Sequence, residues 1–298
     1  MLQYNHIVSE KDTLLCLLSQ PSTNLISMPF SVLMSLYWKE RQEFLRLSLE
    51  SVFNQSLAPD EVVLVEDGPV GEELERVVSE FSAEHPEMKV VRLPENGGLG
   101  KALNEGLRHC SHELVARMDT DDISMPSRFE RQVDYMSRHP ETDAVGAWID
   151  EFIDDRSNVV STRRLPETNE EIRAFASSRN PINHPVVMFR KSAVEKAGGY
   201  MDFPLFEDYY LWARMLVDGS RFHNLQESLL WFRSSPDMFR RRGGWKYAYD
   251  EARFLLTLRK LGLSSGVQTV KNICLRFGVR IMPNAVRGFI YKHLLRNS

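Results

Sequence analysis

Short apolar runs alternate with amphipathic stretches between residues 30 and 118 of the chain. Runs that are apolar at every position predict strands buried on both faces, and apolar positions recurring every three to four residues predict helices. The pattern predicts strands at residues 30–37, 61–65, 89–93 and 113–118, and helices at 39–55, 72–84 and 101–110. This alternation predicts an α/β fold, with a Rossmann-like, mainly parallel central sheet flanked by helices.

The alternation loosens after residue 127. Helices are expected at residues 128–138 and 207–217, and a short strand at 185–190. Another strand is expected at 144–153, antiparallel to its neighbours or at an edge of the sheet. Residues 225–232 lead into an Arg/Gly-rich segment.

These patterns divide the chain into three parts. Residues 1–28 lack clear periodicity and are interpreted as an N-terminal extension. Residues 29–238 hold the α/β domain, and residues 239–298 form a basic C-terminal region with helical periodicity.

Polar side chains follow the first four predicted strands, at Tyr37, Asp67, Asn96 and Asp119. In parallel sheets ligands bind beyond the carboxyl ends of the strands. These positions are therefore the expected binding edge.

The strongest chemical signal is the acidic turn Asp119-Thr120-Asp121-Asp122, directly after a buried strand. Three carboxylates in four residues repel one another unless a cation lies between them. Mg²⁺ and Mn²⁺ prefer such oxygen ligands and tolerate bridging phosphates. The alternative is an acidic turn in which Asp122 caps the helix that starts near Ser127. The position at a strand end favours a metal site on Asp121 and Asp119.

Two further signals lie at the same edge. Asp67 can accept hydrogen bonds from a nucleotide base or from ribose, or it can be a turn residue before Gly68. Asn96 and Lys101 belong to a Gly-rich turn into a helix, where backbone amides suit phosphate, although a simple loop fits the pattern nearly as well.

Later in the chain, Glu207 and Asp208 open an aromatic-rich helix. They complement the helix dipole, and one of them can serve as a general base. His184 precedes an apolar run and is a candidate metal ligand or acceptor contact, or a structural histidine. A basic cluster contains Arg241, Arg242 and Trp245, which can contact a diphosphate or lipid headgroups, or can be solvated.

Bulk composition narrows the class of protein. The 298 residues are 43% hydrophobic and 26% charged, as in soluble globular proteins. The three cysteines are far apart and fit neither zinc spacing nor a disulfide framework, which favours a reducing cytoplasm. No apolar stretch reaches the length of a membrane span.

The charge is unevenly distributed. The net charge is −4, but residues 239–298 contain 13 Lys/Arg and 2 Asp/Glu, which gives that region +11 and the remainder −15. A basic tail on an acidic body indicates docking on an anionic surface, such as membrane lipid or nucleic acid. The tail also shows amphipathic helical spacing, which fits a membrane interface and packing onto the body equally well.

The ordered motifs FSVLMSLYWKE, VVLVEDGP, NGGLGKALNEG, MDTDD, HPVVMFRKSAVEKAGGY and FEDYYLW resemble the family 2 inverting glycosyltransferases with the GT-A fold. Within that family the chain is similar to bacterial transferases of O-antigen and exopolysaccharide synthesis, including the amylovoran type. The resemblance covers about residues 30 to 233, so it makes residues 29–238 the catalytic domain.

This resemblance implies roles for the candidate residues. Asp67 would hold the uracil or ribose of a UDP-sugar, and Asn96 and Lys101 would also contact this donor. Asp119 and Asp121 would take the ribose and the Mn²⁺ or Mg²⁺ of the diphosphate, and Asp122 would lie near the donor sugar. The catalytic base would be Asp208, or else Glu207. The family motif assigns no metal-binding role to His184.

The resemblance also implies a reaction and a location. A hexose, glucose or galactose, would pass from UDP to an undecaprenyl-diphosphate-linked saccharide, with β-1,3 linkage to GlcNAc as one option. The protein would then be cytoplasmic, peripherally associated with the inner membrane, and would bind no nucleic acid.

Three other classes fit the residues less well. A sugar nucleotidyltransferase needs a Gly-rich basic loop after the first strand, where Trp38-Lys39-Glu40-Arg41 stands instead. A processive polysaccharide synthase would carry membrane spans and a QxxRW signature. A non-enzymatic nucleic-acid-binding module could use the basic tail, but the acidic body and the carboxylates at strand ends do not suit it.

Overall fold

The computed structural model describes residues 28–234 and 244–281. Its first half has the predicted alternation of strands and helices. The elements in order are β1 (Phe30–Leu36), α2 (Gln42–Phe53), β2 (Glu61–Glu66), α3 (Glu72–Glu84), β3 (Met88–Arg92), α4 (Leu99–His109) and β4 (Leu114–Asp119). Each predicted element of this half is confirmed, with ends that differ by at most three residues.

The second half is more irregular and contributes both strands and short helices. Its elements are β5 (Ile123–Ser124), α5 (Arg128–Arg138), β6 (Ala144–Phe152), β7 (Val159–Arg163), α6 (Asn169–Phe175), the 3₁₀ turn η1 (His184–Val186), β8 (Met188–Arg190), α7 (Lys191–Lys196), α8 (Glu207–Val217) and β9 (Phe222–Arg233). The helices predicted at 128–138 and 207–217 are confirmed.

The strands of the described residues form one nine-stranded sheet in the order β3-β2-β1-β4-β8-β6-β9-β5, with β7 paired to β6. β1 pairs in parallel with β2 and β4, and β2 with β3, as the helical crossovers predict. Beyond β4 the sheet is mixed, because β8 runs antiparallel to both β4 and β6.

Two predictions for this second half hold only in part. For the strand predicted at 144–153 the antiparallel alternative is confirmed with β7 and β8, but β6 is parallel to β9 and runs inside the sheet rather than at an edge. The strand predicted at 185–190 begins only at Met188, because Pro185 lacks an amide hydrogen and lies in the 3₁₀ turn η1.

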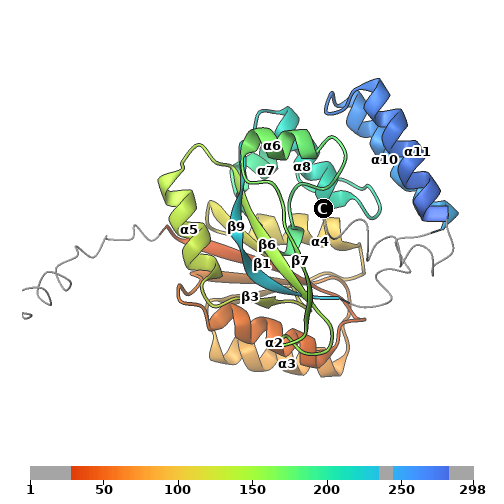
Figure 1. Cartoon of the computed structure of the whole chain (residues 1–298). Coiled ribbons are helices and arrows are strands. Elements are labelled where there is room, and N and C mark those ends of the chain that lie inside the picture. The colour runs from red at the N-terminus through yellow and green to blue at the C-terminus, as the bar shows by residue number, and fades with distance from the viewer. Residues whose placement is uncertain (1–27, 235–243, 282–298) are drawn as a thin grey trace, which may run out of the picture.

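Helices cover both faces of the sheet (Figure 1). Val32 and Met34 of β1 pack with the apolar faces of α2, α3 and α5, whereas Leu33 packs with those of α4 and α8. The α4 layer lies very close to the sheet. A Cβ atom on Gly106 would lie 2.3 Å from Leu33 Cδ1 and 2.6 Å from Val65 Cγ2, so only glycine fits there.

The described part of the basic region forms two helices, α10 (Trp245–Lys260) and α11 (Gly266–Ile281), which pack against each other. Phe254 of α10 stacks on Phe206 in the core of the body. Glu251 is 2% exposed and accepts hydrogen bonds from Arg276 and Arg280 of α11. No helix within residues 28–234 and 244–281 is both long and apolar enough to cross a membrane.

Candidate active site

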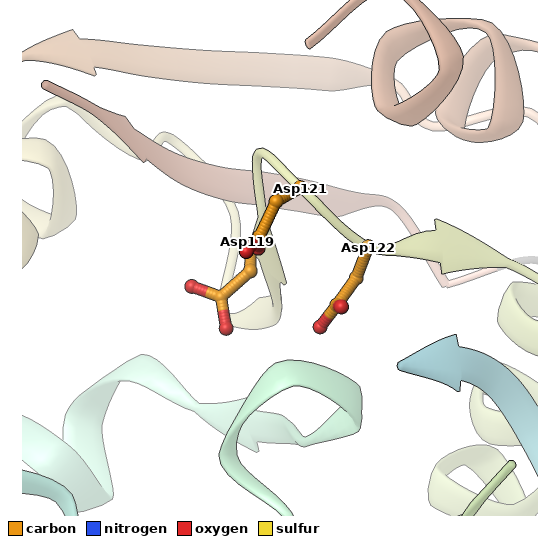
Figure 2. A group of neighbouring side chains, drawn as sticks. All are labelled: Asp119, Asp121 and Asp122. Atoms are coloured by element: carbon orange, nitrogen blue, oxygen red, sulfur yellow. The ribbon is translucent and has the colours of Figure 1, made fainter. Parts of the chain in front are cut away.

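The acidic turn lies where β4 ends. Asp119 is the last residue of β4, and Asp121 and Asp122 belong to the turn that leads to β5. Figure 2 shows all three side chains projecting from this single turn, and one carboxylate oxygen from each can be chosen so that all lie within 4.8 Å of one another. The two side chains predicted to hold a metal, Asp119 and Asp121, are therefore brought together, with Asp122 beside them.

The electrostatics of this turn are unfavourable without a cation. Burial and the neighbouring carboxylates raise the pKa of Asp121 to about 7, and they also raise the pKa of Asp122 well above its ordinary value. A group of hard carboxylate oxygens that oppose one another's ionisation fits Mg²⁺ or Mn²⁺, whose charge would remove the repulsion.

The three carboxylates have different partners. One Asp119 oxygen forms an ion pair with Arg117, which is 2% exposed. Asp122 is fully buried, and its Oδ1 accepts a hydrogen bond from the backbone N–H of Arg233 at 2.8 Å. The interpretation of Asp122 as a helix cap is therefore wrong, since α5 begins after Ser127 and has no side-chain cap. Asp121 and Asp119 retain the most accessible oxygens.

Asp67 organises the glycine turn before α4. Its Oδ1 accepts a hydrogen bond from the N–H of Gly97 at 2.7 Å, and its Oδ2 accepts from the N–H of Gly98 and from Asn96 Nδ2, both at 3.0 Å. Gly68, beside Asp67, has φ +82°, and a Cβ there would lie 2.6 Å from the backbone nitrogen of Asn96. These bonds shape the loop between β3 and α4.

Lys101 lies in the first turn of α4 and is exposed. A Cβ on Gly97 would lie 3.1 Å from Lys101 Cδ, so the lysine side chain lies alongside the glycine turn. The turn therefore places a cation near the N-terminus of α4, while the amides of Gly97 and Gly98 already donate to Asp67.

Glu66, at the end of β2, is a candidate that the sequence analysis passed over. It is 2% exposed, and its Oε2 pairs with Arg92 Nε at 3.1 Å. No described residue hydrogen-bonds to its buried Oε1. Burial raises the pKa of this carboxyl group to about 7. A buried acid at a strand end, beside Asp67, was the signal that could have identified it.

Asp208 and Glu207 form the first turn of α8. Asp208 Oδ2 accepts a hydrogen bond from Asn180 Nδ2 at 2.6 Å, and burial raises the pKa of its carboxyl group. A Cβ on Gly100 would lie 3.7 Å from Glu207 Cγ, so Glu207 adjoins the N-terminus of α4. Burial also raises the pKa of Glu207.

Tyr200 and Arg117 connect Asp208 to the acidic turn. The pKa of Tyr200 is raised mainly by burial, with contributions from the charges of both Asp208 and Asp119. The charge of Arg117 acts on Asp208, Asp121 and Asp122 alike. The acidic turn and Asp208 therefore belong to one electrostatic neighbourhood, although 85 or more residues separate them in the sequence.

His184 lies outside the group of three carboxylates. It is 8% exposed, and its Nε2 is 2.9 Å from the Tyr200 hydroxyl. Burial and the charge of Arg117 lower its pKa, so the neutral ring is favoured at pH 7. Through Tyr200 it still adjoins the neighbourhood of Asp208.

Two more residues border the acidic turn, and the sequence analysis missed both. Arg233 donates from Nε to the Asp121 carbonyl at 2.9 Å, and its guanidinium lies 3.8 Å from the Phe44 ring centroid. Glu40 accepts a hydrogen bond from Thr120 at 3.2 Å, and its pKa is raised by burial. Glu40 ends the motif FSVLMSLYWKE, but no local pattern places it or Arg233 beside the acidic turn, so only the fold could bring them there.

The basic cluster is only partly described. Arg241 and Arg242 lie outside the described residues. Trp245 begins α10, is 69% exposed, and contacts the Phe277 ring of α11 edge-on at 5.6 Å.

A sheet whose parallel strands end in clustered carboxylates beside a helix N-terminus is typical of α/β proteins that bind nucleotide phosphates. The particular family follows from comparison with known proteins. The chain matches Glycosyl transferase family 2 over residues 31–198, more than half its length, and it belongs to that family. It is therefore a glycosyltransferase. The family match disfavours the two alternatives, a sugar nucleotidyltransferase and a non-enzymatic binding module.

Two relatives match almost over their full length. The amylovoran biosynthesis glycosyltransferase AmsE of Erwinia amylovora is 44% identical over 266 residues, which cover 88% of this chain and 98% of the relative. The UDP-Gal:alpha-D-GlcNAc-diphosphoundecaprenol beta-1,3-galactosyltransferase of Escherichia coli is 36% identical over 267 residues, which cover 90% and 96%.

Among solved structures, the fold is similar to the mannosyltransferase PcManGT from Pyrobaculum calidifontis in complex with GDP-Man and Mn²⁺. The TM-score is 0.58 at 16% identity, over 92% of this chain and 83% of the other. This likeness identifies the fold as GT-A and confirms the fold class expected from the sequence.

Proposed function

We propose that this protein transfers a hexose, with inversion, from a UDP-sugar to a lipid-diphosphate-linked saccharide in the synthesis of O-antigen or exopolysaccharide repeat units. The observation that carries the proposal is the shared neighbourhood of the acidic turn and Asp208 at the edge where the parallel strands end. The Escherichia coli relative, which is named for UDP-Gal and a GlcNAc-diphosphoundecaprenol acceptor, supports galactose as donor sugar and a β-1,3 linkage.

Asp208 is the proposed general base. Its carboxylate takes the proton of the acceptor hydroxyl, while the hydroxyl oxygen bonds to the anomeric carbon of the donor. The bond from that carbon to UDP breaks, its electron pair leaves with UDP, and the configuration at the carbon inverts. The hydrogen bond from Asn180 holds the carboxylate in place.

Asp121 and Asp119 are the proposed ligands of Mn²⁺ or Mg²⁺, with Asp122 behind them. When bound, the ion would stabilise the negative charge that develops on the UDP diphosphate. The Mn²⁺ in the PcManGT complex supports this choice of metal. Arg117 holds Asp119 by an ion pair, and Arg233 fixes the turn through its bonds to Asp121 and Asp122.

The glycine turn and the end of β2 are proposed to bind the nucleotide. Asp67, with Asn96, shapes the loop, and Lys101 adds a cation near the diphosphate. Glu66 has an unpartnered oxygen that can accept the imide N–H of uracil.

The C-terminal region is proposed to bring the protein to the cytoplasmic surface of the inner membrane. Its support is the +11 charge of residues 239–298 and the exposed valines of α11, Val267 at 84% and Val270 at 58%. Arg241, Arg242 and Trp245 would meet headgroups or the acceptor diphosphate.

The test is a titration of UDP with and without Mn²⁺, by calorimetry, on the wild type and Asp121→Ala. We expect the metal to strengthen UDP binding to the wild type. Asp121→Ala should remove most of that gain, because one ligand is missing. The matched variant Asp134→Ala, which removes an acid on α5 that is ion-paired with Arg138, should bind like the wild type. If the affinity of the wild type for UDP is the same with and without Mn²⁺, the metal assignment is contradicted.

A further inference from the structure

A second cavity, distinct from the acidic turn, lies between α8 and α10. It has a volume of about 630 Å³, within the range of small-molecule sites. Its lining includes three cations, two aromatic rings and one acid: Arg253, Arg259, Lys260, Phe203, Tyr210 and Asp202. The charged side chains of the lining therefore sum to about two positive charges, while the chain as a whole carries −4.

Arg253, Arg259 and Lys260 differ from the arginines of α11, the helix that forms a hairpin with α10. Arg276 and Arg280 are neutralised by the buried carboxylate of Glu251. Within the described ranges, by contrast, no salt bridge joins the side chain of Arg253, Arg259 or Lys260 to an acid. Cations that outnumber the acids of a cavity lining and form no salt bridge suit an anionic ligand, and above all phosphate groups.

The cavity adjoins the proposed base through α8. Tyr210 follows Asp208 by two positions, so the two side chains lie roughly 200° apart around the helix. Phe203, five residues before Asp208, forms the other aromatic wall. A ligand in the cavity is thus separated from the base by about the width of one helix, roughly 10 Å. The diphosphate beyond the reducing end of a sugar whose far hydroxyl meets the base lies at a comparable separation.

The lining also has an apolar part, which suits a hydrocarbon group of the ligand. Leu256, 46% exposed, lies on α10 beside the cations. A cavity with cations, aromatic rings and an exposed leucine fits a ligand that is part sugar, part phosphate and part hydrocarbon.

We propose that this cavity binds the diphosphate at the reducing end of the lipid-linked acceptor and thereby selects acceptors that carry it. This inference rests on the proposed function. Arg253 lies 5.6 Å from the Phe203 ring centroid, which holds its guanidinium at the cavity wall. Lys260 and Arg259 supply two further donors at the C-terminal end of α10.

The test compares two soluble acceptors, a short-chain GlcNAc-diphosphate-lipid and a neutral alkyl GlcNAc glycoside. Binding of each is measured by titration in the presence of UDP and Mn²⁺, and transfer is measured where it occurs. For Arg253→Ala with Lys260→Ala we expect affinity for the diphosphate acceptor to fall by roughly tenfold or more, because charged hydrogen bonds are lost. Binding of the neutral glycoside and of UDP should not change.

The matched control is Lys246→Ala with Lys271→Ala, which removes two exposed charges from the same hairpin outside the cavity lining. It should leave both acceptors unaffected. The proposal is overturned if the wild type does not prefer the diphosphate acceptor, or if the cavity variant binds both acceptors like the wild type. It is also overturned if that variant loses only binding to vesicles of anionic phospholipid, since the cations would then serve headgroups. Failure of the proposed function would instead appear as a wild type that does not bind UDP.

Discussion

Asp208 and Asp121 have different surroundings, and these suit different parts of the proposed reaction. Among the described residues, Asp208 is held by the neutral amide of Asn180, and the carboxylate beside it is Glu207. Asp121 has two carboxylate neighbours in its own turn. The first environment favours a carboxylate that takes up a proton, and the second favours one that needs a cation.

Replacement of the proposed base gives a prediction at the scale of the residue. Asp208→Asn should lower kcat by a factor of about 10² to 10⁴, because no group remains to accept the proton, while UDP binding with Mn²⁺ stays intact. Glu207→Gln is the matched control and should retain far more activity. If Glu207→Gln abolishes transfer and Asp208→Asn does not, the base is Glu207.

The same residue predicts a pH dependence. The base acts only when ionised, and burial raises the pKa of Asp208 above that of an ordinary aspartate. Transfer should therefore fall as the pH drops through this raised pKa, at a higher pH than a solvent-exposed aspartate would produce. Measuring kcat against pH, with UDP saturating, tests this. The residual kcat of Asp208→Asn should not show this decrease as the pH drops.

At the scale of elements, the close packing of α4 on β1 and β2 positions the glycine turn relative to the acidic turn. Gly106 allows this approach, since any Cβ there would collide with Leu33 and Val65. Asp67 then ties the N-terminus of α4 to the end of β2 through three hydrogen bonds. The glycine turn and the end of β2, two segments of the proposed donor site, are thus held together by α4.

Gly106→Ala tests this packing. Alanine is the better helix former by about 1 kcal/mol, but overpacking a core costs about 1–3 kcal/mol, so the net effect should be a lower free energy of unfolding. Gly278→Ala in α11 is the matched control. Among the described residues, no atom outside its own helix backbone lies within 4 Å of its added Cβ, so it should gain about 0.5–1 kcal/mol. Urea unfolding measures both, and equal gains would contradict the close contact.

At the scale of the whole molecule, the described part of the tail has a packed face and an exposed face. α10 buries Phe254 and Glu251 against the body and α11, so the described tail is part of the folded unit. Its outer side still exposes apolar and cationic groups, as the amphipathic periodicity predicted. The two interpretations of the tail, packing and membrane contact, therefore concern opposite faces of the same helices.

Membrane contact can be tested without disturbing the packed face. Val267→Ser with Val270→Ser should weaken sedimentation with anionic liposomes, because both valines are exposed apolar groups that would be buried in the interface. The thermal midpoint should stay unchanged. Leu47→Ser, on α2, removes a similarly exposed apolar group and serves as control. Unchanged sedimentation would mean that α11 does not contact lipid.

Local patterns in the sequence were enough for the parallel half of the sheet, because strand and helix periodicity and turn chemistry depend on near neighbours. They also located Asp67, Asp119, Asp121 and Asp208 at element ends. Contacts between distant segments had no such signal. Only the tertiary structure shows that Arg233 holds Asp122, that β6 lies inside the sheet, and that α10 closes a cavity beside α8. Each of these contacts joins residues that the fold, not the local pattern, brings together.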